Sequence, residues 1–221
     1  MNDGAALPRW RGALVAVGAL ALALGMTGCL GASAPGGPAA DGGTPSGPPA
    51  TIPAADGEVM GQGTVLQRDG ETAMLCLGAV MESYPPQCSG PEIAGWDWSS
   101  VEGAESASGV TWGAYAVQGT WDGVTFTSTA EPIMLALYDP MVEPDPFLDP
   151  ANTGASSDDE LAAVQAELDN AELSGLLSSW PQNGYLFVHV VYDDGSLQQW
   201  VDGAYGADVV QVRSALRPIA G

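Results

Sequence analysis

The chain of 221 residues carries 27 acidic side chains against five arginines, no lysine and one histidine, and its formal net charge is −22 at pH 7. A surface this acidic repels nucleic-acid phosphates and anionic headgroups, which excludes nucleic-acid binding and a peripheral membrane-binding face. We interpret the acidic side chains as residues that keep the protein soluble, because a high net charge favours solubility.

Residues 1–28 have the parts of a secretory signal peptide. Arg9 and Arg11 form a basic start, an apolar run follows from 13 to 24, and small residues precede Cys29. The apolar run is too short and too rich in glycine for a membrane-spanning helix, which needs about 20 apolar residues.

The segment Leu24-Gly25-Met26-Thr27-Gly28-Cys29 resembles the lipobox of bacterial lipoproteins, with Met26 where leucine is usual. The resemblance implies transfer of diacylglycerol to the Cys29 thiol and cleavage before this residue. Two acyl chains give stable attachment, so we expect the protein on the extracytoplasmic side of the cell membrane. An ordinary signal peptide followed by a coincidental cysteine is the alternative.

After Cys29 the composition changes to glycine, alanine, proline, serine and threonine, with almost no charge and no aromatic residue up to Gly57. Such a sequence cannot bury enough apolar surface to offset the entropy of ordering it. We therefore predict a flexible tether over residues 29–57.

Residues 58–134 show short runs of strand-forming residues separated by glycine-containing turns. We predict five strands, at 61–66, 73–80, 91–98, 112–121 and 124–129. Asp122-Gly123 between the last two is the strongest hairpin signal in the chain. Five short strands of this kind favour a small β-barrel, and we expect an OB-like barrel.

Once Cys29 is lipidated, the mature chain keeps only Cys76 and Cys88. An even pair of cysteines in an exported protein favours one disulfide. A metal site is the alternative, but two cysteines without nearby histidines make a poor zinc shell.

Residues 135–157 are rich in Asp, Glu and Pro, and proline follows Asp139, Glu143, Asp145 and Asp149. Residues before proline prefer extended backbone, so we predict an acidic linker. Several carboxylates could bind calcium, but their spacing matches no calcium-binding loop.

Residues 158–221 are predicted to form a small α/β unit of helix, strand, helix and strand. Ser157 and Glu160 form a capping-box pattern before a helix with apolar residues at helical spacing. The nearly continuous apolar run 185–192 predicts a strand buried on both faces. A short helix at 196–202 and a strand at 209–213 complete the unit, so the expected fold class is α+β.

Five short blocks spread over both predicted units carry a family resemblance. They are Leu75-Cys76-Leu77-Gly78, Ser83-Tyr84-Pro85-Pro86-Gln87-Cys88, Gly95-Trp96-Asp97-Trp98, Tyr192-Asp193-Asp194-Gly195-Ser196-Leu197-Gln198 and Ser214-Ala215-Leu216-Arg217-Pro218. These blocks resemble uncharacterised lipoproteins of high-GC Gram-positive (actinobacterial) bacteria. The resemblance implies a shared architecture and brings no activity with it.

The sequence contains few residues that could act in catalysis. It has no Gly-x-Ser-x-Gly elbow and no phosphate-binding glycine loop. His189 lies in the middle of a predicted strand, where a structural histidine is favoured over a member of a Ser/His/Asp triad. We expect no catalytic residue, no metal site and no cofactor.

Four tryptophans are candidate ligand-binding residues because their rings could stack on sugars: Trp96, Trp98, Trp112 and Trp121. Their strand positions favour packing as the alternative. The sequence therefore predicts a lipid-anchored, non-catalytic binding or structural module of the cell envelope, with a protein or glycan ligand that it does not identify. A cell-wall or glycan hydrolase that uses acidic residues is the alternative, and a calcium-responsive adhesion module is a third hypothesis.

Overall fold

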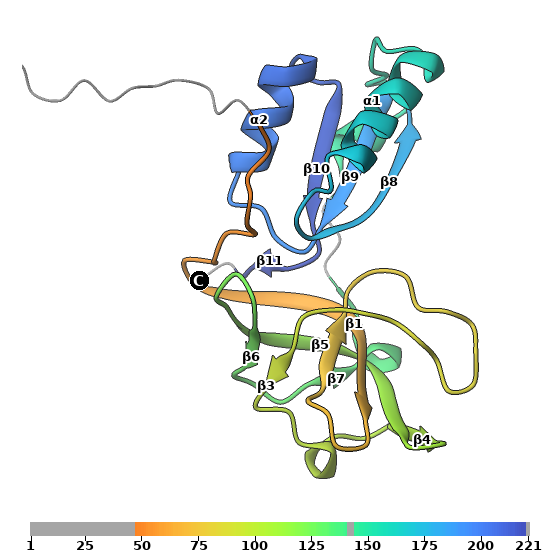
Figure 1. The fold of residues 1–221 in the computed structure, drawn as a ribbon, viewed down its shortest axis with the longest axis vertical. Helices are drawn as coiled ribbons and strands as arrows, with labels where there is room; N and C mark the ends of the chain where they lie inside the picture. Colours follow the sequence, from red (N-terminus) through yellow and green to blue (C-terminus); the bar gives the residue numbers. More distant parts are fainter. Residues whose placement is uncertain (1–46, 141–143, 220–221) are drawn as a thin grey trace, which may run out of the picture. The chain divides into compact units, whose positions relative to one another are not determined.

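The computed structural model describes residues 47–140 and 144–219. The predicted signal peptide, Cys29 and most of the predicted tether lie outside the described residues. The described chain is a mixed α+β fold that belongs to one compact unit. It contains a curled sheet that forms a half-barrel and a smaller sheet with two helices beside it (Figure 1).

Two long strands form the centre of the curled sheet. β1 (Glu58–Arg68) and β5 (Val110–Trp121) pair antiparallel along their whole length, from Glu58 opposite Thr120 to Arg68 opposite Val110. Short strands complete both outer edges. β2 (Met74–Cys76) and β11 (Arg217–Pro218) pair with β1, while β4 (Glu105–Ala107), β6 (Phe126–Ser128) and β7 (Ile133–Met134) pair with β5; β3 (Ile93–Ala94) runs parallel to β6.

The predicted hairpin at Asp122-Gly123 is confirmed. Trp121 pairs with Phe126 across the turn, and Gly123 takes a φ of 98°, which only glycine adopts easily. The Asp122 carboxylate accepts hydrogen bonds from the backbone N–H groups of Val124 and Thr125, at 2.9 and 2.7 Å. These bonds satisfy the backbone donors within the turn.

Three predicted strands are shorter than expected, and the predicted number of strands is too low, because eight strands form the curled sheet. The strand predicted at 124–129 is limited to Phe126–Ser128. The strand predicted at 73–80 ends at Cys76, and the one predicted at 91–98 ends at Ala94. Gly95 then turns the backbone with a φ of 74°, and a 3-10 turn η1 (Trp98–Ser100) follows. The Asp97 side chain caps this turn by accepting from Ser99 N, so residues 96–98 do not alternate across a sheet.

The smaller sheet has the order β10-β9-β8. β9 (Tyr185–Val190) and β10 (Val210–Ser214) are parallel and are connected through α2 (Ser196–Tyr205), whereas β8 (Leu176–Gln182) pairs antiparallel with β9. β8 was not predicted. The predicted unit thus gains a strand between its first helix and β9.

The first helix begins as predicted. α1 (Asp158–Asn170) has Ser157 as its N-cap, and the reciprocal capping box between Ser157 and Glu160 is present. Apolar residues of both helices pack with alternate residues of β9, namely Leu186, Val188 and Val190. Within the described residues, no helix is long and apolar enough to cross a membrane.

The other face of the smaller sheet is covered by part of the predicted acidic linker, which contains η2 (Leu135–Leu137) and η3 (Pro146–Leu148). The Phe147 ring meets Tyr185 edge-on, and the Asn183 amide donates to three backbone carbonyls of this segment. The Asp145 carboxylate forms an ion pair of 2.7 Å with Arg213. Residues 144–154 therefore form part of the folded structure, and β9 is buried on both faces as predicted.

The end of the predicted tether also packs against the fold. Trp121 Nε1 donates to Pro53 O and Ala55 N donates to Trp121 O, both at 2.9 Å. The Ser174 hydroxyl donates to Ala50 O at 2.9 Å. The segment 50–55 thus packs on the fold before β1 begins, because the indole of Trp121 provides both an apolar surface and a hydrogen-bond donor for residues whose composition predicts flexibility.

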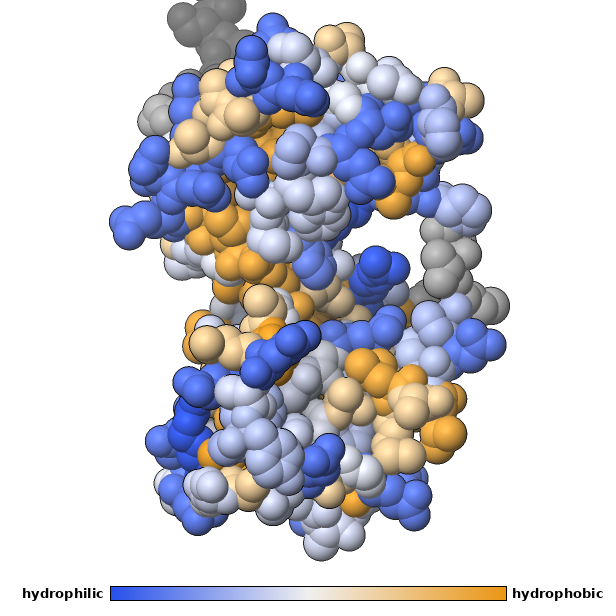
Figure 2. All heavy atoms as spheres, turned by 90° about the vertical axis from the view of Figure 1, so that its right-hand side faces the viewer, coloured by the Kyte–Doolittle hydropathy of each residue, from blue (hydrophilic) through white to orange (hydrophobic). Residues whose placement is uncertain are grey.

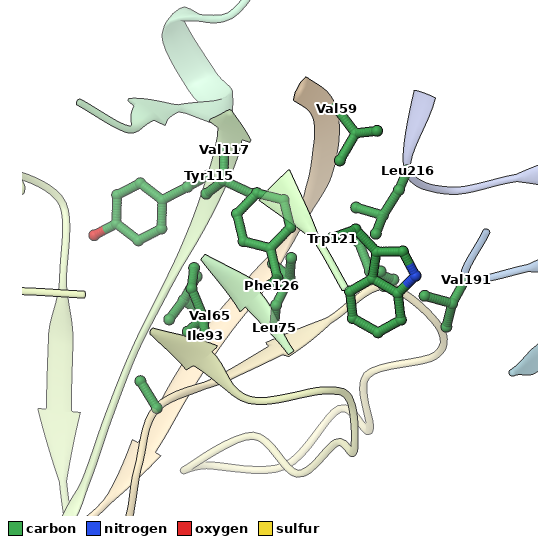
Figure 3. Close-up of a cluster of buried hydrophobic side chains, with 12 residues drawn as sticks. Val59, Val65, Leu75, Ile93, Tyr115, Val117, Trp121, Phe126, Val191 and Leu216 are labelled. Atoms are coloured by element: carbon green, nitrogen blue, oxygen red, sulfur yellow. The ribbon is translucent and has the colours of Figure 1, made fainter. Parts of the chain in front are cut away.

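A buried apolar cluster links the curled sheet to residues that follow β9 and β10. Phe126, Tyr115 and Trp121 form its aromatic part, and Trp121 turns toward Val191 and Leu216 (Figure 3). Both of these residues are at most 5% exposed. The two sheets therefore share one hydrophobic contact region.

Candidate functional site

Two of the four candidate tryptophans are core residues. Trp112 is 8% exposed, packs near Cys76 and meets the Tyr84 ring edge-on at 5.3 Å. Trp121 is 2% exposed, and its indole N–H is bonded to Pro53 O. Neither ring offers a free face to a ligand.

The other two tryptophans are half-buried neighbours outside the strands. The rings of Trp96 and Trp98 meet edge-on with centroids 5.3 Å apart, and Trp96 lies 5.1 Å from the ring of the buried Tyr115. Trp98 Nε1 donates to Gln67 Oε1 at 2.6 Å. Trp96 Nε1 is buried and has no hydrogen-bond partner among the described residues. The hydrogen bond to Gln67 thus fixes the Trp98 ring, against which the Trp96 ring packs.

Trp96 lines a hollow of about 380 Å³, and this hollow adjoins a second one of about 500 Å³. We call the pair the Trp96 groove. The two hollows share Ser100, Val101, Glu131 and Pro132. The first is also lined by Ser128 and Thr129, whose hydroxyl groups donate to Ala130 O and to the Glu58 carboxylate. The second is lined by the apolar residues Ile133, Met134 and Leu137 and by the polar residues Ser99 and Glu102. The groove thus combines an aromatic ring at one end with a mixed apolar and polar lining at the other.

Carboxylates give the Trp96 groove a negative character. Asp97, Glu102 and Glu131 all line it and are exposed. The backbone N–H and hydroxyl of Ser99 donate to Asp97 and lower the pKa of this carboxyl group. Asp97 is therefore ionised at neutral pH, so the groove favours neutral or cationic ligands. Glu58, whose pKa Thr129 and Gln118 lower in the same way, lies outside the lining of the groove.

His189, the single histidine of the chain, lines a different pocket of about 360 Å³, which we call the His189 pocket. Its lining comes from both sheets and from the segment after η2, and includes Gln62, Tyr138 and Arg217. Burial, followed by the nearby Arg217 charge, lowers the pKa of His189. Its imidazole is therefore neutral at pH 7.

The predicted disulfide is confirmed. Cys76 and Cys88 are bonded with an S–S distance of 2.03 Å and a Cα–Cα distance of 6.0 Å. Cys76 is buried against Leu66 of β1 and Trp112 of β5, so the bridge fixes the loop after β2 next to these two strands. Within residues 47–140 and 144–219, no three His, Cys, Asp or Glu side chains lie close enough together to hold a metal ion.

Hydrophilic residues predominate on the face that Figure 2 shows, and hydrophobic residues form separate patches between them.

The sequence pointed to the tryptophans but not to the residues with hydroxyl and carboxyl groups that also line the groove. Ser128 and Thr129 are the last residues of the strand predicted at 124–129, and Glu131 follows it closely, so this polar end of the predicted hairpin was the available signal.

Comparison with known protein families, with curated proteins and with solved structures finds no match for this chain.

Proposed function

We propose that this protein is a lipid-anchored, extracytoplasmic lipoprotein that binds a glycan of the cell envelope in the Trp96 groove and has no catalytic role. The half-buried Trp96 ring, which lines one hollow together with residues that carry hydroxyl and carboxylate groups, carries this proposal. An aromatic face packs against the C–H groups of a sugar ring, while polar groups around it bond to the sugar hydroxyls.

Rigidity supports binding at this place. Trp96 packs against Trp98 and Tyr115, and Trp98 is held by Gln67. The ring therefore loses little conformational freedom when a ligand covers it, which lowers the entropic cost of association. The carboxylates of the groove favour a neutral glycan or one with an amino group.

A glycan hydrolase is the second candidate function, because carboxylates flank the groove. Such an enzyme needs a carboxyl group whose pKa is raised so that it can donate a proton. Every carboxyl group with a shifted pKa in the described part shifts downward: Glu58, Asp97, Asp122, Asp145, Glu160 and Asp194. Asp97 is also occupied as the cap of η1. These observations favour binding over hydrolysis.

The Trp96→Ala variant tests the groove. We expect glycan-array screening to identify a bound envelope glycan, and the variant to bind it about tenfold more weakly, equivalent to about 1.4 kcal/mol. Trp180→Ala removes another partly exposed tryptophan and serves as the matched control. Trp96→Phe should retain part of the affinity, because it keeps a ring. Equal affinities of Trp96→Ala and the wild type, or turnover of the glycan, would refute the proposal.

The anchor has a separate test. Cys29→Ser should release the exported protein from the membrane fraction, because the thiol that accepts the lipid is lost. A variant that stays in the membrane fraction would refute lipid attachment at Cys29.

We also propose that the curled sheet is an OB-like barrel. Support comes from the way in which β1 and β5 each pair with different short strands at their two ends, as strands do when a sheet curls upon itself. An experimental structure with a flat sheet or without the β1–β11 pairing would refute this.

A further inference from the structure

The His189 pocket differs in charge from the rest of this acidic protein. Among the described residues, its lining contains no Asp or Glu, although the chain carries 27 acidic residues. It contains instead His189 and Arg217, together with the polar residues Gln62 and Tyr138. These side chains offer hydrogen-bond donors: a guanidinium, an imidazole, an amide and a phenol.

The two cationic side chains near this pocket have different partners. Arg213 donates to both carboxylate oxygens of Asp145, at 2.7 and 3.0 Å, and lies over the rings of Phe147 and Phe187. Arg217 is exposed, and none of the described residues forms an ion pair or hydrogen bond with its side chain. The hydrogen bond from Arg213, and to a smaller extent the nearby charge of Arg217, lower the pKa of the Asp145 carboxyl group. Asp145 is bonded to Arg213, so of these two arginines Arg217 is the one whose guanidinium is left for a ligand in the described part.

The fold brings Arg217 and His189 together from distant parts of the chain. His189 lies in β9, on the face away from the helices. Arg217 begins β11, which pairs with Met60 of β1 at the edge of the curled sheet. Two groups that repel when both are charged thus line one pocket, and burial adds to the cost of charging the imidazole.

We propose that the His189 pocket binds a small oxyanion, a carboxylate or phosphate group, between Arg217 and His189. An anion at this place compensates the guanidinium and stabilises the protonated imidazole. Binding and protonation of His189 are therefore linked, and affinity rises as the pH falls toward 5.5. The other charged groups that face this region are the mutually paired Arg213 and Asp145 and the exposed Asp139 beside Tyr138. This inference does not depend on the Trp96 groove.

The lone histidine makes the test direct, because the full chain without a histidine tag gives one imidazole signal in a 1H–13C NMR spectrum. The signal is followed as a function of pH, with and without inorganic phosphate or sodium acetate, at constant ionic strength set with sodium chloride. Without a ligand, His189 should titrate below 6.5. A bound oxyanion should raise this midpoint by about one unit, so that the same anionic form binds about fivefold more tightly at pH 5.5 than at pH 7.5.

Arg217→Gln should abolish the saturable shift and raise the ligand-free pKa of His189. Arg68→Gln makes the same change of charge at an arginine outside the pocket and should bind like the wild type. An unchanged urea midpoint confirms that each variant folds. If neither anion gives a saturable shift, or if the two variants respond alike, the proposal is wrong. Binding of only one of the two anions supports it and assigns the ligand class.

Discussion

The bridge between Cys76 and Cys88 should supply a large part of the stability of the curled sheet. The double variant Cys76→Ala/Cys88→Ala removes the bridge and places alanine at the buried position. Alanine is preferable to serine there, because a serine hydroxyl beside Leu66 and Trp112 would lack a partner.

The size of the effect follows from the loop that the bridge closes. The two cysteines are 12 positions apart in sequence. A crosslink at this spacing removes about 9–10 cal/mol/K of entropy from the unfolded chain, equivalent to about 3 kcal/mol at 25 °C. Loss of the buried sulfur contacts adds about 1 kcal/mol. We expect the free energy of unfolding to fall by about 4 kcal/mol.

Urea unfolding followed by tryptophan fluorescence measures this change, and Trp112 reports from beside the bridge. A reductant should lower the stability of the wild type by about 3 kcal/mol and leave the double variant unchanged. A loss below about 1 kcal/mol, or an equal effect of the reductant on both proteins, would refute the reasoning.

Three further predictions concern the described fold. The hydrogen bonds from Arg213 hold the pKa of Asp145 below its usual value, so its contribution to stability is present above about pH 4 and is lost as the pH falls through the folded pKa. Asp145→Asn should therefore cost about 1 kcal/mol in urea unfolding at pH 7 and almost nothing near pH 2, and equal costs would contradict this. Gly119→Ala should cost about 3 kcal/mol in thermal unfolding, because its Cβ would lie 2.0 Å from a backbone oxygen of β6, whereas Gly57→Ala has open space and is the control. Leu216→Ala should also cost about 3 kcal/mol, since this side chain is fully buried between the two sheets, and a loss below about 1 kcal/mol would show that the contact is dispensable.

Several elements could be predicted because their causes are local. The Asp122-Gly123 turn, the capping box of Ser157 and Glu160, and the apolar run of β9 each depend on residues close together in sequence. β8 was missed because it contains Ser178, Ser179 and Pro181 and is mostly exposed. Asn183-Gly184, which turns β8 into β9 with positive φ at both positions, was a hairpin signal that could have found it.

The short strands could not be predicted, since two or three residues carry no alternation that a pattern can detect. β7 and β11 exist because β1 and β5 are long enough to offer edges beyond their mutual pairing, whereas β3 pairs with the short strand β6. The same limit applies to the sites. Trp98 is held by Gln67, 31 positions earlier, and Arg217 reaches the His189 pocket through the pairing of β11 with β1.

The net charge of −22 and an oxyanion pocket are compatible because charge acts over a limited distance. At physiological ionic strength, interactions between exposed charges are largely screened beyond about 8 Å, so most carboxylates of this chain contribute little inside the His189 pocket. Binding of the proposed oxyanion would depend mainly on the side chains that line the pocket, and among the described residues these include hydrogen-bond donors and no carboxylate. The Trp96 groove has the opposite character because Asp97 and Glu131 line it directly. Composition describes the average field of the molecule, whereas the ligand that we propose for each of the two hollows follows from the few side chains that the fold places around it.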